Sequence, residues 1–215
     1  MVQKTQPAAK AANLADGAIA KRPTHAKSRQ RFEKILDEAE KIVEESGLSG
    51  FSIPVLAERL GFTRASIYHF FPTPFAVLNE LEMRYHEDSK LQIIDAGVGS
   101  AKLSWEQIVR VGIEKTAEYY NQRPVARMLL LGRLMSGDNI NIQEQNNLQL
   151  ANVFRGLFSS FGITLPTEPD VGWIAIDIVH SVFSHSQYVH KTITPACVDE
   201  AYNACTGYLR CYINS

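Results

Sequence analysis

The sequence predicts an all-α protein of about nine helices, and three observations support this. Apolar residues recur three and four positions apart along most of the 215 residues, as they do on one face of a helix. Residues that start helices, such as Ser, Thr and Pro, stand before several of these stretches, and strict apolar–polar alternation is not found. Hydrophobic residues make up 45% of the chain and charged residues 21%, which is ordinary for a globular protein with one or two cores.

Residues 52–71, SIPVLAERLGFTRASIYHFF, predict two short helices joined by a tight turn. Ser52 and Thr63 are suited to cap the two helices, because a side-chain hydroxyl can accept an unpaired backbone N–H. Gly61 can adopt the left-handed conformation that ends a helix. The apolar positions at helical spacing are expected to face the core: Ile53, Leu56, Ala57, Leu60, Ile67 and Phe71. This pattern is typical of a helix-turn-helix DNA reader, although a plain helical hairpin can also carry Gly in its turn.

The remaining helices are indicated by the same signals. They are expected at residues 32–43, 75–94, 105–120, 124–131, 150–161, 169–183 and 195–212. Gly47 lies just beyond the first of these stretches, where a helix can end. Ser104 and Gln107 have the spacing of a capping box, and Pro124 and Pro195 suit the first turns of their helices.

The net charge of −1 conceals a basic N-terminus. Residues 1–31 carry seven basic residues against one acidic residue, Asp16, so this segment is +6 and the rest of the chain is about −7. The basic residues are Lys4, Lys10, Lys21, Arg22, Lys27, Arg29 and Arg31. A basic arm beside a helix-turn-helix can reach DNA phosphates or a minor groove, whereas a solvated, disordered tail is the simpler expectation for Lys4 and Lys10.

Several classes of protein are disfavoured. The N-terminus lacks the apolar core of a signal peptide and no run is long enough to span a membrane, so we expect a cytoplasmic protein without a membrane partner. The three cysteines, at 197, 205 and 211, form no CxxC pair, which argues against a disulfide framework. Cys205 lies on an apolar stripe and is expected to be buried, with a redox role as the alternative.

Enzymatic and metal-binding patterns are also missing from the sequence. We find no nucleophile elbow, zinc-ligand pattern, P-loop or dinucleotide fingerprint, so we expect no enzyme and no cofactor. The histidines at 180, 185 and 190 are five residues apart, which spreads them around a helix, so a shared metal site is not expected.

The run at 63–71, TRASIYHFF, resembles the recognition helix of the TetR (tetracycline-repressor-like) family of bacterial regulators, and so does the preceding SIPVLAERLGF at 52–62. The sequence motif covers about residues 28–85, while the layout of helices matches over 25–213. The resemblance implies a basic, disordered tail at 1–24 and a three-helix helix-turn-helix DNA-binding domain at 25–75. A larger helical ligand-binding and dimerisation domain would follow at 76–215.

The family resemblance further implies a homodimeric transcriptional regulator, commonly a repressor, that binds operator DNA and a small-molecule effector. One short recognition helix makes too few contacts for specific binding, and a two-fold dimer on a palindromic operator doubles them. Dimerisation is expected through the last two helices, around Val179 to Phe183 and Tyr202 to Leu209. In such a dimer, a mostly apolar ligand can favour a separation of the two DNA-binding domains that does not fit the operator. Binding of that ligand would release the DNA.

The DNA-contacting residues can be assigned from the family motif. They are expected to be Arg29, Ser52, Thr63, Arg64, Ala65, Ser66, Tyr68, His69 and Thr73. Arg64, Ala65 and Ser66 would read base edges, with Arg64 placed for a bidentate guanine contact, and the hydroxyl and ring side chains would hold phosphates. Tyr68 can alternatively pack in the core. Family members usually have Lys after the aromatic run, whereas Thr73 stands here between two prolines and can replace that contact only weakly.

The ligand site is expected between the later helices, where apolar residues accompany a few polar ones. The candidates are Trp105, Tyr119, Met128, Met135, Phe154, Trp173, Asp177, His180 and Phe183. Ordinary core packing is the alternative for each. Asp177 and His180 can hydrogen-bond a ligand, pair with one another across the dimer interface, or serve as the acid–base pair of a helical enzyme. Arg127 and Arg133 can anchor an anionic end of a ligand or simply reach solvent.

A ligand-independent DNA-binding adaptor is the main alternative to a sensor. A cavity on the order of a few hundred cubic ångströms among the later helices favours the sensor, and a closed core favours the adaptor.

Overall fold

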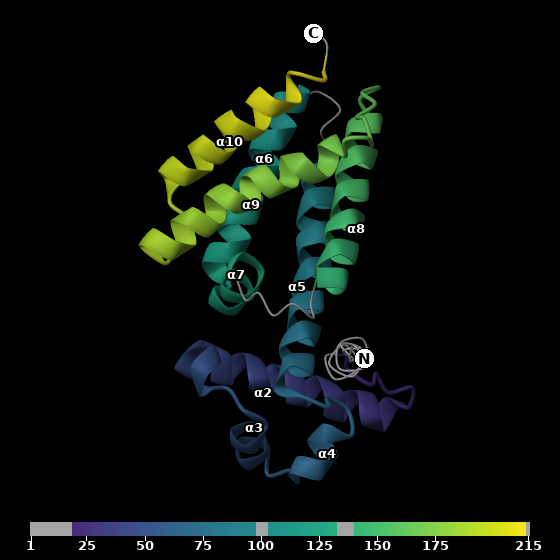
Figure 1. Cartoon of the computed structure of the whole chain (residues 1–215), viewed down its shortest axis with the longest axis vertical. Helices are drawn as coiled ribbons and strands as arrows, with labels where there is room; N and C mark the ends of the chain where they lie inside the picture. The colour runs from purple at the N-terminus through teal and green to yellow at the C-terminus, as the bar shows by residue number, and fades with distance from the viewer. Residues whose placement is uncertain (1–18, 98–102, 133–139, 214–215) are drawn as a thin grey trace, which may run out of the picture. The chain divides into compact units, whose positions relative to one another are not determined.

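A computed structural model describes residues 19–97, 103–132 and 140–213, and in this part of the chain every regular element is a helix (Figure 1). The predicted all-α fold is confirmed. The helices are α2 (Ala26–Gly50), α3 (Ile53–Leu60), α4 (Arg64–Tyr68), α5 (Pro74–Gly97), α6 (Trp105–Gln122), α7 (Pro124–Leu131), α8 (Ile140–Ser159), α9 (Val171–His190) and α10 (Pro195–Leu209). None of these helices is both long and apolar enough to cross a membrane.

The described residues form two compact units. The first unit contains residues 19–84 with 140–141, and the second contains 85–97, 103–132 and 142–213. The helix α5 passes from one unit to the other between Arg84 and Tyr85. Of the basic N-terminal tail predicted at 1–24, residues 1–18 lie outside the described residues.

The core of the first unit forms around one face of α2. Six residues of that face are buried: Phe32, Ile35, Leu36, Ala39, Ile42 and Val43. The ring of Phe32 stacks on Phe71 with a centroid distance of 4.6 Å, and Ile67 of α4 is fully buried in the same core. The apolar spacing in the sequence therefore identified the side chains that form this core.

The turn of the helix-turn-helix forms as predicted. The Ser52 hydroxyl accepts the backbone N–H of Val55, and the Thr63 hydroxyl accepts that of Ser66, at 3.4 and 3.3 Å. Gly61 ends α3 with φ of 62°, the left-handed conformation that glycine adopts without steric cost. These local bonds fix where α4 begins and which side chains it exposes.

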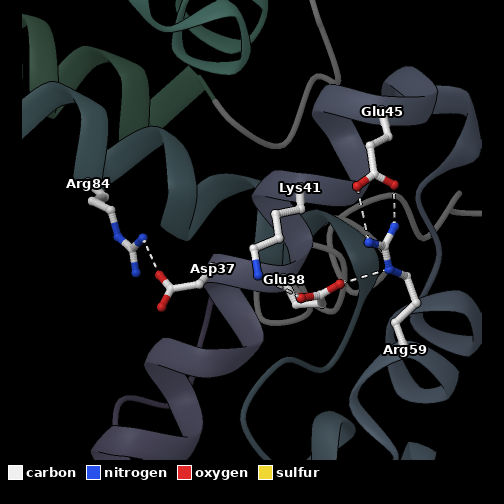
Figure 2. A network of polar contacts seen from close by, with 6 residues as sticks. All are labelled: Asp37, Glu38, Lys41, Glu45, Arg59 and Arg84. Carbon is white, nitrogen blue, oxygen red and sulfur yellow. Dashed lines mark hydrogen bonds and ion pairs between the residues drawn. The ribbon is translucent and has the colours of Figure 1, made fainter.

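Two arginines join the helices of the first unit through ion pairs (Figure 2). Arg59 of α3 contacts Glu38 and Glu45 of α2, and Arg84 of α5 contacts Asp37 of the same helix. Arg84 also pairs with Glu33 at 2.6 Å. Since α2 carries the acidic partners of both arginines, α3 and α5 are held to one common support.

The second unit is built around the neighbouring helices α9 and α10, with α6 packed on α10 and α7 on α9 (Figure 1). Asn121 holds the α9–α10 turn, because its side chain accepts from the Ile193 N–H at 2.8 Å and donates to the Ile193 carbonyl at 2.9 Å. The capping box of Ser104 and Gln107 is present at the start of α6. Thr194 caps α10 through the Cys197 N–H.

Several of the apolar residues that we expected at a dimer interface are already buried within the single chain. Phe183 of α9 and Leu209 of α10 are 0% exposed, and Cys205 is 1% exposed as predicted. A second subunit cannot reach these side chains, so the expectation for Leu209 and Phe183 is corrected. The outward face of α9 and α10 carries other exposed residues: Asp177, Ser181, His185, Tyr188, Asn203, Ala204 and Gly207.

Candidate functional site

The short helix α4 presents polar side chains to solvent. Thr63, Arg64, Ala65, Tyr68 and His69 are exposed and Ser66 is half-buried. Tyr68 is 45% exposed, so the alternative that its ring packs in the core is wrong. The first turn of α4 therefore places its side chains where a groove of DNA can receive them.

Hydrogen bonding within the turn limits what its hydroxyls can do. The Ser66 hydroxyl donates to the Thr63 carbonyl at 2.8 Å, so its oxygen is left as an acceptor. The hydroxyls of Ser52 and Thr63 accept backbone N–H groups and can still donate to a phosphate oxygen. Thr73 is half-buried, and its hydroxyl accepts the Ala76 N–H at the start of α5.

A basic groove lies beside α4 in the first unit. Its charged residues are Lys27, Arg31 and Lys34 of α2, while Ser66 of α4 and His69, just after that helix, form the other side. None of the described residues that line the groove is acidic. Cationic side chains along a groove of this kind suit the phosphate backbone of DNA.

One of these groove residues is oriented by an aromatic ring. The guanidinium of Arg31 lies over the Phe62 ring, 4.5 Å from its centroid, and Phe62 belongs to the turn before α4. Arg29 is exposed on α2 but does not line the groove. The sequence reading missed Lys34. The spacing of 27, 31 and 34 places all three cations on one helical face, and that signal was available.

The segment before α2 is fixed to the first unit. The Lys21 N–H donates to the Phe70 carbonyl at 2.7 Å, and the Arg22 guanidinium pairs with Glu80 of α5 at 2.7 Å. Burial raises the pKa of the Glu80 carboxyl, and Arg22 acts in the opposite direction. The basic segment is thereby held next to the end of α4.

The second unit contains a cavity of about 70 Å³ lined by residues of α5, α6, α8, α9 and α10. Most of its lining is apolar. Its polar residues are Ser89, Thr116, Tyr120 and His180. Of the residues predicted to bind a ligand, Phe154 and His180 are in this lining.

The other ligand candidates lie elsewhere. Tyr119 is buried with Arg123 over its ring, Phe183 is in the core, and Trp173 packs against the cluster of Leu150, Ala151 and Ile176. Trp105 contacts Phe158 at a centroid distance of 6.2 Å, and Met128 is half-buried on α7. Met135 and Arg133 lie outside the described residues.

Asp177 and His180 do not pair with each other. Asp177 is exposed and hydrogen-bonds the Trp173 side chain, whereas His180 lines the cavity and lies 3.5 Å from the Tyr120 hydroxyl. Burial lowers the pKa of His180 to about 4, with the neighbouring His86 acting in the same direction. An acid–base pair of these two residues is therefore absent from the geometry.

Arg127 is also unavailable to a ligand in the cavity. Its guanidinium donates to the Gln187 side chain at 2.6 Å and to the Tyr120 carbonyl at 3.0 Å, and it does not line the cavity. Within the described part of the chain, no cluster of three His, Cys, Asp or Glu residues is arranged to hold a metal ion.

Part of the sequence matches one protein family, and the structure as a whole resembles solved structures of one fold. Residues 35–81 match the family described as bacterial regulatory proteins, tetR family. No curated protein matches the sequence. A TetR-family transcriptional regulator from Streptomyces coelicolor has a TM-score of 0.67 at 16% identity, covering 85% of this chain and 99% of that one.

Two further solved structures share this architecture. A transcriptional regulator from Rhodococcus sp. Rha1 has a TM-score of 0.63 at 14% identity, covering 83% of this chain and 95% of its own. The TetR-family regulator PfmR from Thermus thermophilus has a TM-score of 0.52 at 20% identity, covering 82% and 97%. These likenesses concern the fold of nearly the whole chain.

Proposed function

We propose that this chain, whose residues 35–81 match the tetR family of bacterial regulatory proteins, is a ligand-responsive repressor that binds a palindromic operator as a homodimer. The observation that carries this proposal is the exposed face of α4 beside a groove of Lys27, Arg31 and Lys34. One compact unit therefore carries both the side chains that can contact base edges and the cations that can contact phosphates.

The proposed reading of DNA divides the work between two groups of side chains. Arg64, at the start of α4, donates to guanine acceptors in the major groove. The cations of α2 and the capping hydroxyls of Ser52 and Thr63 hold phosphates, and so set the register. The ion pairs of Arg59 keep α3 and hence α4 at a fixed angle to α2 during binding.

The proposed dimer uses the outward face of α9 and α10. The helix α4 has five residues, so a specific site requires a second copy on the same side of the duplex. Ala204 and Gly207 are small and exposed, and a Cβ built on Gly207 meets no atom within 4 Å. Small residues on α10 let a partner helix approach closely, and the exposed Tyr188 of α9 adds apolar area to the outward face.

The proposed response to a ligand passes through α5. This helix supplies Ser89 to the cavity and Arg84 to ion pairs with α2. A ligand that binds one position of α5 more tightly than another shifts the dimer towards the corresponding arrangement of its DNA-binding domains. The size of the shift is set by the difference in ligand affinity between the two arrangements.

A ligand-independent adaptor is favoured by one specific observation, the size of the cavity. At about 70 Å³ it is smaller than the roughly 300 Å³ or more that drug-sized ligands occupy. A sensor with this cavity must therefore bind a small molecule or repack its lining.

The test begins with selection from random duplexes by the purified full chain, followed by mobility shifts on the enriched sequence. Enrichment of a palindrome, lost in Arg64→Ala, supports the operator proposal, and enrichment of no common sequence overturns it. Pools of small metabolites are then added to the protein–DNA complex. Release of the DNA supports the ligand-responsive repressor, and retention of the DNA supports the ligand-independent adaptor.

A further inference from the structure

The polar residues of the cavity meet at one place among apolar neighbours. Tyr120 of α6 lies with its hydroxyl 3.5 Å from the His180 Nε2 of α9, and it also hydrogen-bonds Ser89 of α5. The Ser89 hydroxyl itself donates to the Tyr85 carbonyl at 2.9 Å. Three helices therefore bring one small hydrogen-bonding cluster to a cavity lined otherwise by apolar side chains.

The imidazole of His180 has unused hydrogen-bonding capacity. The one hydrogen-bond contact that it makes within the described residues is the 3.5 Å approach to Tyr120, which is long for a hydrogen bond. A neutral imidazole carries one donor and one acceptor nitrogen, so His180 can still bond a ligand oxygen. Thr116 offers less, because its hydroxyl donates to the Gly112 carbonyl at 2.7 Å.

The charge of the lining selects the ligand class. Among the described residues that line the cavity there is no Lys, Arg, Asp or Glu. The pKa of His180 is lowered by burial to about 4, so the ring is uncharged near neutral pH. An anion or cation would lose its water shell there without a compensating charge, which is strongly unfavourable.

The volume limits the ligand to a few non-hydrogen atoms. At roughly 10–15 Å³ for each water-sized group, about 70 Å³ corresponds to roughly five to seven such groups. Gly112 of α6 belongs to the lining, and a Cβ built on it meets no atom within 4 Å. A larger side chain at Gly112 would therefore grow into the cavity.

We propose that the effector is a small uncharged molecule, largely apolar, with a single hydroxyl or carbonyl oxygen that bonds His180 and Tyr120. This inference rests on the proposed ligand response and names the class of molecule that the same cavity accepts. It disfavours the anionic ligand that Arg127 was expected to anchor.

The probes are cyclohexanol, cyclohexanone and cyclohexanecarboxylate, which share a six-carbon ring and differ in the polar group. Their binding to the DNA-free full chain is measured by titration calorimetry at neutral pH. We expect the alcohol or the ketone to bind and the carboxylate to bind at least tenfold more weakly.

Three variants test the site, and one of them is a matched control. His180→Phe keeps a ring of similar size and should weaken the neutral probes at least tenfold without lowering the Tm. Gly112→Leu should abolish their binding, whereas Gly156→Leu, at an exposed helical glycine of α8, should leave it unchanged. Binding that survives in Gly112→Leu is not in this cavity and overturns the inference.

The remaining outcomes separate this inference from the proposed function. Equal or tighter binding of the carboxylate, or no binding of any probe, overturns the neutral-ligand inference. Binding of the alcohol or ketone that is weakened in His180→Phe, lost in Gly112→Leu and unchanged in Gly156→Leu supports the inference, whether or not DNA is released. In that case, retention of the selected operator by the liganded protein counts against the proposed ligand response alone.

Discussion

Arg59 of α3 forms a two-point ion pair with Glu45 of α2, with nitrogen–oxygen distances of 2.6 and 3.2 Å (Figure 2). The same guanidinium contacts Glu38 at 2.8 Å. The helix that precedes the recognition helix is thus fixed to α2 by one side chain. The contact lies at the surface, so its strength depends on salt and pH.

We predict that Arg59→Met lowers the Tm slightly and weakens operator binding, because α3 is less firmly held. Arg59 lowers the pKa of Glu45 from 4.5, so the pair stabilises the protein above that pH and loses its effect as pH falls through the lowered value. The Tm difference from wild type should therefore shrink in acid and in high salt. Lys41→Met, which removes a simpler contact to Glu38, is the control. A Tm difference unaffected by salt would contradict the ionic account.

Base and phosphate contacts should respond differently to mutation. We predict that Arg64→Ala costs roughly 1–3 kcal/mol of operator affinity and relaxes the preference at one base pair. Tyr68→Phe, which removes one exposed hydroxyl, should weaken all duplexes by a similar factor. Mobility shifts on the operator and on single-base variants check both. If Arg64→Ala weakens binding to all duplexes by the same factor, Arg64 contacts the DNA phosphates and not a base.

Gly61 should tolerate no side chain without cost. Because its φ is 62°, we predict that Gly61→Ala destabilises the protein by about 1–2 kcal/mol. Gly156→Ala is the matched control. It lies in the exposed interior of α8, where Ala should stabilise the helix by about 0.5–1 kcal/mol. Urea unfolding monitored by circular dichroism measures both changes, and equal signs would argue against a strained turn.

His180 should make the protein less stable in mild acid. Its pKa falls from 6.5 to about 4 on folding, so the unfolded chain binds the proton more readily. Stability is therefore predicted to fall as the pH drops from about 6.5 towards 4, by at most about 3 kcal/mol at 1.36 kcal/mol per pKa unit. His180→Phe removes this titration. The unfolding free energy of the wild type minus that of His180→Phe is measured at pH 7 and at pH 4.5, and it should be smaller at pH 4.5.

The proposed dimer can be separated from folding of the single chain. We predict that Gly207→Arg splits the dimer and abolishes operator binding without lowering the helix content, because the position faces solvent in the single chain. Leu209→Glu should instead unfold the protein, since Leu209 is fully buried. Sedimentation at micromolar concentration reports the mass. A wild-type protein that sediments as a single chain would contradict the proposed assembly.

Local features were predictable because their hydrogen bonds join residues three or four apart. Ser52, Gly61 and Thr63 specify the turn through bonds within 52–66, so the sequence alone contains every participant. The apolar period also identified the buried face of α2, because helix geometry converts spacing directly into direction. The turn and the starts of its two helices therefore needed no tertiary information, whereas the exposure of Tyr68 was decided by the structure.

The ligand cavity and the outward face of the last two helices depended on tertiary structure. Phe154 and Phe183 both lie at apolar helical positions, yet Phe154 lines the cavity and Phe183 fills the core. Which apolar residue faces a cavity depends on how helices distant in sequence pack together, and periodicity within one helix carries no such information. For the same reason Leu209 looked like an interface residue. Packing within the chain buries it and leaves the small residues Ala204 and Gly207 exposed.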